Sequence, residues 1–224
     1  MINLLEQSEQ LVEEETVQTL FLNSMHYIYK AYLEMIKTFP IKYKKEDDIN
    51  DLLYAALLKV LQGDDGNSML RPIAQSYNPL KRNTHGKASQ VDLSIIWSLD
   101  AKHDSKQFYF ECKRLSCNDK NKAYVNNGIK RYEDNFYAES MPYAAMIGYI
   151  ENGDIDSIIK DINKKMTIHC ISNITKNTKA YYQSVHMRNK NNDIDLYHIF
   201  FDFRDCQNRA KLCKGHKNNT STFF

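Results

Sequence analysis

Three charged residues in the middle of the chain have the types and spacing of a metal-assisted catalytic site. Asp92 stands near the start of a mostly apolar run, and Glu111 and Lys113 stand one residue apart at the end of an aromatic-rich run. Charges in segments that otherwise resemble core strands are costly unless they are paired or bind a metal. Two carboxylates make a hard-oxygen site suited to Mg²⁺ or Mn²⁺, and the backbone carbonyl of Cys112 offers a further oxygen.

The chemistry that these groups suit is metal-assisted hydrolysis of a phosphodiester. Such a reaction needs a Lewis acid, an activated water and a cation that offsets the charge building up on the phosphate oxygens. In this interpretation Asp92 and Glu111 hold the metal. Lys113 orients or helps to deprotonate the water and stabilises the developing charge.

Two strands joined by a polar turn must position these side chains. The strands are predicted over 91–99 and 107–115, with the turn over 100–106. Neighbouring strands lie about 4.8 Å apart, so an antiparallel hairpin brings Asp92 within reach of Glu111. Strand side chains alternate between faces. One face of the second strand then carries Tyr109, Glu111 and Lys113, and the other carries Phe108, Phe110 and Cys112.

Helices are predicted before this hairpin. Apolar residues between 4 and 12 predict a short helix, and those from 17 to 36 predict a longer one that begins near Thr16 and ends before Pro40. The apolar stripe of the longer helix either packs on the rest of the fold or forms a dimer surface. Another helix is predicted over 46–62, with acidic residues in its first turn that complement the helix dipole.

A second set of elements follows the hairpin. A helix is predicted over 123–139, ended by Pro142, with an apolar face of Val125, Ile129, Tyr132 and Phe136. The apolar run 143–150 predicts a strand buried on both faces, and 154–166 predicts an amphipathic helix. Strands over 181–188 and 194–203 predict a hairpin that carries His186, Arg188 and His198, for which structural roles are favoured.

Composition limits the class of protein. The 224 residues are 42% hydrophobic and 26% charged, as in soluble globular proteins, and the net charge of +2 restricts any nucleic-acid surface to a local patch. The sequence predicts neither a signal peptide nor a membrane span, and a cytoplasmic location is therefore expected. Five scattered cysteines do not suggest a disulfide framework. A zinc site of Cys206, Cys213 and His216 is a weaker alternative.

The order of these elements around Asp92 and the triplet Glu111-Cys112-Lys113 resembles the PD-(D/E)XK, or restriction-endonuclease-like, nuclease superfamily. In that family an acidic residue on one strand precedes an E-x-K strand of the same sheet, and a helix and a hydrophobic strand follow. The resemblance covers roughly residues 45–150. It departs from the family pattern in three places. Val91 stands where proline is frequent, the following helix offers Asn126, Asn127, Lys130 and Arg131 where many relatives have glutamine, and residues after 165 match nothing assignable.

The resemblance implies an α/β fold with a mixed central sheet flanked by helices. Residues 1–44 would be an N-terminal helical extension, 45–205 the nuclease-like domain with its C-terminal hairpin, and 206–224 a basic polar tail. Family members often add a carboxylate from the helix before the sheet, for which Glu46 is the first candidate and Asp51 the second. The implied activity is that of a Mg²⁺-dependent nuclease, expected to be a DNA endonuclease of restriction or defence type.

Contacts to the nucleic acid are predicted to come from basic side chains near the site. These are Lys81, Arg82, Lys87, Arg114, Lys130 and Arg131. Three alternatives remain open at this point: an inactive nuclease-fold subunit that binds nucleic acid or scaffolds a larger complex, a ribonuclease, and a mostly helical interaction protein with an incidental hairpin. A homodimer or a partner subunit is also compatible with the sequence, since cutting both strands of a duplex is simplest with two sites.

Overall fold

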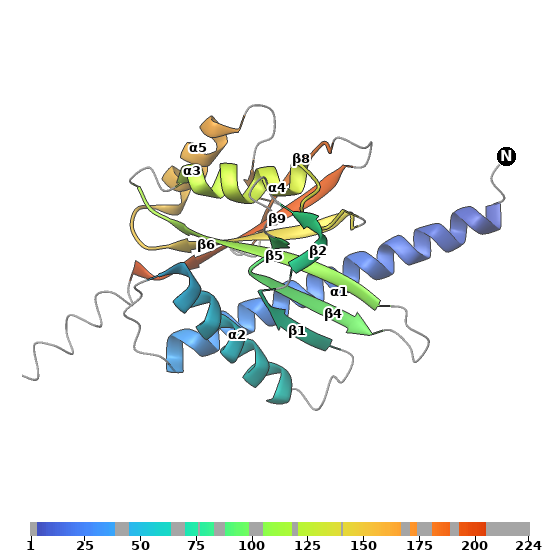
Figure 1. Ribbon diagram of the computed structural model, residues 1–224, viewed down its shortest axis with the longest axis horizontal. Coiled ribbons are helices and arrows are strands. Elements are labelled where there is room, and N and C mark those ends of the chain that lie inside the picture. Colours follow the sequence, from blue (N-terminus) through green and yellow to red (C-terminus); the bar gives the residue numbers. More distant parts are fainter. Residues whose placement is uncertain are drawn as a thin grey trace, which may run out of the picture.

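A mixed β-sheet lies between two layers of helices (Figure 1). The computed structural model describes residues 4–38, 45–63, 70–75, 77–82, 88–98, 105–117, 121–139, 141–166, 171–173, 181–188 and 193–204. The helices are α1 (Leu4–Thr38), α2 (Glu46–Gly63), α3 (Asn121–Tyr124), the π-helix η1 (Val125–Ile129), α4 (Lys130–Glu133) and α5 (Ile155–Lys165). The strands are β1 (Leu70–Ala74), β2 (Tyr77–Arg82), β3 (Ala88–Gln90), β4 (Leu93–Ser98), β5 (Ser105–Leu115), β6 (Tyr143–Ile150), β7 (Ser172–Asn173), β8 (Tyr181–His186) and β9 (Ile194–Asp202).

The sheet combines parallel and antiparallel pairs. Over the described residues, seven strands pair in the order β1-β4-β5-β6-β9-β8-β7, and β2 pairs with β3 apart from them. The central strands β5, β6 and β9 are parallel, and the flanking pairs are antiparallel. Both predicted hairpins, β4–β5 and β8–β9, are therefore confirmed, as is the strand–helix–strand unit from β5 to β6. The mostly helical alternative is wrong.

The two faces of the sheet belong to two hydrophobic cores. On one face α1 and α2 pack against the sheet, and on the other the helical run 121–133 and α5 cover it (Figure 1). As the alternation of β5 predicted, Phe108, Phe110 and Cys112 all face the α1–α2 core. Phe21 of α1 lies with its ring 5.3 Å from that of Phe108. The interpretation of the α1 stripe as internal packing is therefore confirmed.

The amino-terminal region forms one helix where two were predicted. Helix α1 runs unbroken from Leu4 to Thr38. The polar segment 13–16 interrupts the apolar stripe, but it is rich in glutamate, which has high helix propensity and does not end a helix. Neither α1 nor any other described helix combines the length and the apolar content that crossing a membrane requires.

The helix after β5 is shorter than predicted. The run 121–133 ends at Glu133, well before Pro142. Asn135 then takes a positive φ of 57°, a conformation that asparagine adopts more readily than most residues. The chain turns there because of this local geometry, and the proline has no part in it. Of the predicted apolar face, Val125, Ile129 and Tyr132 are buried.

Gly148 in β6 leaves room for side chains of the two strands beside it, β5 and β9. A Cβ at this position would lie 2.4 Å from Cδ1 of Leu115 and 2.7 Å from Cδ1 of Phe200. We therefore expect Gly148→Ala to lower the free energy of unfolding by about 1–3 kcal/mol, the usual cost of overpacking, in urea denaturation. Gly63→Ala is the matched control, because its Cβ would meet nothing within 4 Å. Equal effects of the two substitutions would contradict the packing argument.

Candidate functional site

The end of pairing between β4 and β5 opens the candidate site. The pairing stops with Leu93 opposite Phe110, whereas β5 continues to Leu115 and stays paired with β6 on its other side. Backbone N–H groups alternate in direction along a strand. Those of residues 112 and 114 therefore point to the side that β4 has left, where side chains from other elements accept them.

Two carboxylates are anchored on these N–H groups. Asp92, at the bend before β4, accepts a hydrogen bond from the backbone N–H of Cys112 through Oδ2 at 2.8 Å. Glu46, at the first position of α2, accepts from the backbone N–H of Arg114 through Oε2 at 3.0 Å. The strand backbone thus fixes both acidic groups beside the E-x-K segment.

The ammonium group of Lys113 lies at the centre of the site. Its Nζ is 2.8 Å from Oε1 of Glu111, 3.1 Å from Oε1 of Glu46 and 3.5 Å from Oδ2 of Asp92. It also donates to the backbone carbonyl of Cys112 at 2.5 Å. The structure therefore brings together the four side chains that sequence reasoning selected, and the carbonyl with them.

Between the two upstream candidates, the structure places Glu46 in the site. Asp51 lies on the same helix but is exposed. The position of Glu46 follows from the helix start, because the first residue of α2 lies beside the open edge of β5.

Burial makes the charges of Glu111 and Lys113 interdependent. Glu111 exposes 1% of its surface, and burial, followed by the charge of Asp92, raises the pKa of its carboxyl group to about 7. Lys113 and Arg131 act in the opposite direction on that pKa. Although burial opposes the charge of Lys113, the surrounding carboxylates raise its pKa above the usual range. Lys113 is therefore a cation held by the acidic groups around it.

Arg131 approaches the same carboxylate from the helical layer. Its Nη1 donates to Oε1 of Glu111 at 3.2 Å and to the hydroxyl of Tyr137 at 2.6 Å. Sequence reasoning selected Arg131 as a phosphate contact and missed Tyr137. The helical periodicity of the sequence does not indicate a site role for Tyr137, because this residue lies beyond the end of α4, where the chain turns.

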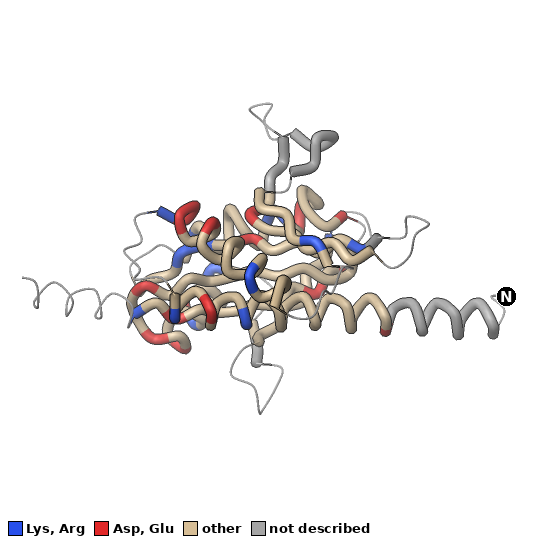
Figure 2. The backbone as a smooth tube through the Cα atoms, turned by 90° about the horizontal axis from the view of Figure 1, so that it is seen from below, with Lys and Arg blue, Asp and Glu red and all other residues tan. Residues whose placement is uncertain are grey.

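The other predicted phosphate contacts are more scattered. The guanidinium of Arg114 is paired with Glu151, so its side chain is not directed to the carboxylate cluster, by which we mean Glu46, Asp92 and Glu111. Lys130 is exposed, and Lys81 and Arg82 belong to β2. Lys87 lies outside the described residues. Figure 2 shows basic and acidic positions interspersed along the described chain.

A divalent cation fits the donor set of this site. Within the described ranges, no three His, Cys, Asp or Glu side chains form a ready metal site, and Lys113 lies between the carboxylates. The oxygens of Asp92, Glu111 and the Cys112 carbonyl are nevertheless the hard ligands that Mg²⁺ and Mn²⁺ prefer. Oε2 of Glu111 is buried and has no hydrogen-bond partner among the described residues. An orphaned carboxylate oxygen of this kind is available to a cation.

The raised pKa of Glu111 predicts a pH dependence of stability in EDTA. The ordinary pKa is 4.5 and the value in the folded chain is about 7. The resulting stabilisation is complete below pH 4.5 and is lost as the pH rises through about 7. We expect the unfolding free energy of the wild type, relative to Glu111→Gln, to fall across this window in urea denaturation. A difference that is constant with pH would contradict the assignment.

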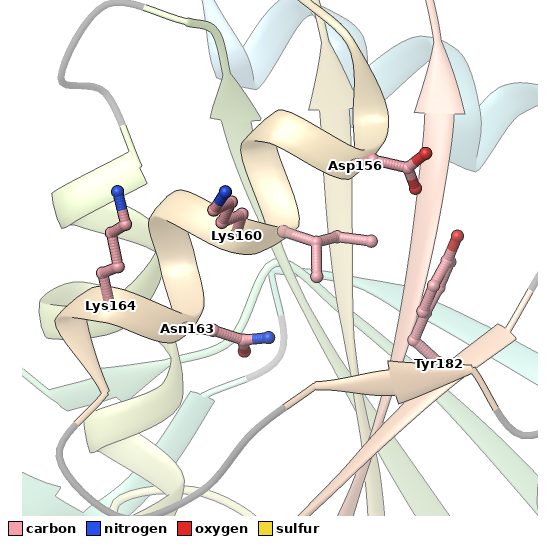
Figure 3. Close-up of a pocket in the computed structure, with 6 residues that line it drawn as sticks. Asp156, Lys160, Asn163, Lys164 and Tyr182 are labelled. Atoms are coloured by element: carbon pink, nitrogen blue, oxygen red, sulfur yellow. The ribbon is translucent and has the colours of Figure 1, made fainter.

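A pocket of about 450 Å³ lies elsewhere, between α5 and β8 (Figure 3). It is lined by Asp156, Ile159, Lys160, Asn163, Lys164 and Tyr182. In Figure 3 the two lysine side chains point away from the tyrosine ring. The Asn163 amide forms hydrogen bonds with the backbone of Ile171. None of the carboxylate-cluster residues contributes to this pocket. The weaker zinc alternative, Cys206, Cys213 and His216, lies outside the described residues.

The geometry of the carboxylate cluster is thus the main guide to function. Comparison of the chain with protein-family models, with curated proteins and with solved structures found no match in any of the three.

Proposed function

We propose that this chain is a divalent-metal-dependent nuclease with a restriction-endonuclease-like core, acting as an endonuclease on DNA. The observation that carries the proposal is the convergence of Asp92, Glu111 and Lys113 where β4 and β5 separate. The mixed sheet, the E-x-K strand and the parallel strand after the crossover helix are the arrangement that the resemblance implies.

The residues divide the work of phosphodiester hydrolysis among them. Asp92, Glu111 and the Cys112 carbonyl would hold Mg²⁺ or Mn²⁺, with Glu46 at the edge of the site. The cation, when bound, supplies Lewis-acid activation of the phosphate and of a water. Lys113 donates hydrogen bonds to the attacking water and offsets charge on the phosphate oxygens. Arg131 is partly exposed and can pair with a phosphate while it orients Glu111.

The alternative of an inactive nucleic-acid-binding or scaffolding subunit has one observation in its favour. The carboxylates are already compensated by the Lys113 ammonium, so the cluster also makes sense as a buried ion-pair network. Catalysis and a structural network make different predictions for activity, so an assay separates them.

The proposal is tested by incubating the purified protein with supercoiled plasmid, labelled single-stranded DNA and labelled RNA. Cleavage in Mg²⁺ or Mn²⁺, and none in EDTA, is expected, with plasmid nicked or linearised at internal positions. Cleavage of RNA alone would change the substrate and keep the chemistry. Complete inactivity of the wild type under all of these conditions would favour the inactive subunit.

A further inference from the structure

A chain of hydrogen-bonded polar side chains joins β8 and β9 to the helical run 121–133. Tyr124 Oη is 2.8 Å from Nδ1 of His198, and Nε2 of His198 is 2.7 Å from Oγ of Ser184. The same Oγ is 2.6 Å from Nε2 of His186, whose Nδ1 is 2.7 Å from Oε1 of Glu133. We call these five residues the polar clamp.

The polar clamp is buried along most of its length. Tyr124, His186 and His198 expose none of their surface and Ser184 exposes 3%, whereas Glu133 reaches the surface. A buried polar group left without a partner destabilises the fold, and a fully connected network holds its members in one arrangement. The hydrogen bonds therefore fix the distance between the helical run and the β8–β9 hairpin.

A continuous run of donors and acceptors satisfies the whole chain. Burial, and secondarily the neighbouring His186, lowers the pKa of His198 well below its usual value, so His198 is neutral and carries a single N–H. Ser184 has one hydroxyl proton and can donate to only one of its two imidazole neighbours. If Tyr124 donates to Nδ1 of His198, then Nε2–H of His198 donates to Ser184, Ser184 donates to Nε2 of His186, and Nδ1–H of His186 donates to the carboxylate of Glu133.

The Ser184–His186–Glu133 segment has the atom pattern of a hydrolase triad, with Nε2 facing the hydroxyl and Nδ1 facing the carboxylate. A nucleophile must, however, be reached by its substrate. Because Ser184 and His186 are buried beneath the helical run, their geometry suits a structural role and not nucleophilic attack on a bound molecule.

The clamp contacts the helical run on both sides of its π-helical turn. Tyr124 ends α3, which directly precedes η1, and Glu133 ends α4, which directly follows η1. A π-helical turn contains an additional residue and is frequent at functional sites. One residue more or less rotates every following side chain by about 100°. Arg131 follows this turn, so its direction depends on the turn staying in place.

We infer that the polar clamp positions Arg131 against Glu111 and so sets the affinity of the site for a phosphate of the nucleic acid. Glu133 is the member nearest to Arg131 in the sequence, two residues along the same short helix, and it is paired with His186. Glu133 is thus a positioning residue that acts through Arg131. The inference rests on the proposed nuclease function.

A double-mutant cycle on the full-length protein tests this inference. Glu133→Ala removes the anchor at the protein surface, and Glu133→Gln keeps an acceptor for His186. We expect Glu133→Ala to raise KM about tenfold with kcat changed less than about twofold, and Glu133→Gln to recover most of the difference. In an Arg131→Ala background, Glu133→Ala should have no further effect on KM. Exposed Asp134 is the control, and Asp134→Ala should leave both constants unchanged.

Two results would overturn the inference. One is an equal change of KM with and without Arg131, which would mean that Glu133 acts independently of it; the other is an unchanged KM in Glu133→Ala. If the wild type cleaves nothing, the proposed function fails by itself. The same variants are then compared by thermal unfolding, where non-additive Tm changes for Glu133→Ala and Arg131→Ala support the clamp and additive changes refute it.

Discussion

Lys113→Ala is expected to lower kcat for DNA cleavage by about 10²–10³-fold, the usual loss when one charge-stabilising donor is removed from an active site. The ammonium group of Lys113 lies against Glu111, Glu46 and the Cys112 carbonyl at once. KM should change much less, because the phosphate keeps its contact with Arg131.

The same variant should respond to Mg²⁺ more strongly than the wild type. Without the ammonium, the three carboxylates keep only the contact of Arg131 with Glu111, so the Tm in EDTA should fall. Mg²⁺ would then restore the Tm by a larger step than it adds to the wild type. Lys59→Ala is the matched control, since it also removes a lysine–glutamate pair, with Glu34 at the surface. Loss of activity in both variants, or in neither, would count against a catalytic role for Lys113.

Asp92→Asn is expected to lower cleavage by at least about 10³-fold, because a metal-bound site loses several kcal/mol of transition-state stabilisation with its metal. Asparagine has the same size and can still accept from the Cys112 N–H through its carbonyl oxygen. The fold should therefore persist. The charge that attracts the cation is lost, so the Mg²⁺-dependent rise in Tm should disappear together with activity.

A second aspartate provides the control for this prediction. Asp202 at the end of β9 also pairs with a basic side chain, that of Arg204, but lies away from the cluster. Asp202→Asn should keep both activity and the response to Mg²⁺. Retained cleavage in Asp92→Asn would remove the central premise of the proposed function.

The sequence predicted the strands of the site because the signals are local. Alternation along β5 separates Glu111 and Lys113 from Phe108 and Phe110, and that pattern depends only on strand geometry. The start of α2 is likewise marked by its acidic first turn and apolar stripe, whereas the choice of Glu46 as a site residue came from the family resemblance. These features need no knowledge of long-range contacts.

The remaining features depend on contacts between distant segments. The bond from Arg131 to Tyr137 requires the chain to turn after α4, and a positive φ at Asn135 is not marked by periodicity. The clamp requires β8 and β9 to pair in one register, which brings His198 opposite Tyr182 and beside Ser184. A histidine on a strand gives no local signal of its partner. The π-helical turn likewise has no simple sequence rule.

The packing of α1 beneath the sheet has a consequence for how the chain reaches its native state. Tyr32 donates a hydrogen bond to the carbonyl of Asp202, 170 positions away, and stacks on Phe201, so α1 and β9 pack directly against each other. During translation the apolar stripe of α1 must wait for β9, which is made much later, before this contact can form. Such long sequence separation predicts slow folding, and shortening the chain to residues 45–205 would remove α1 from the face of the sheet that it shares with α2.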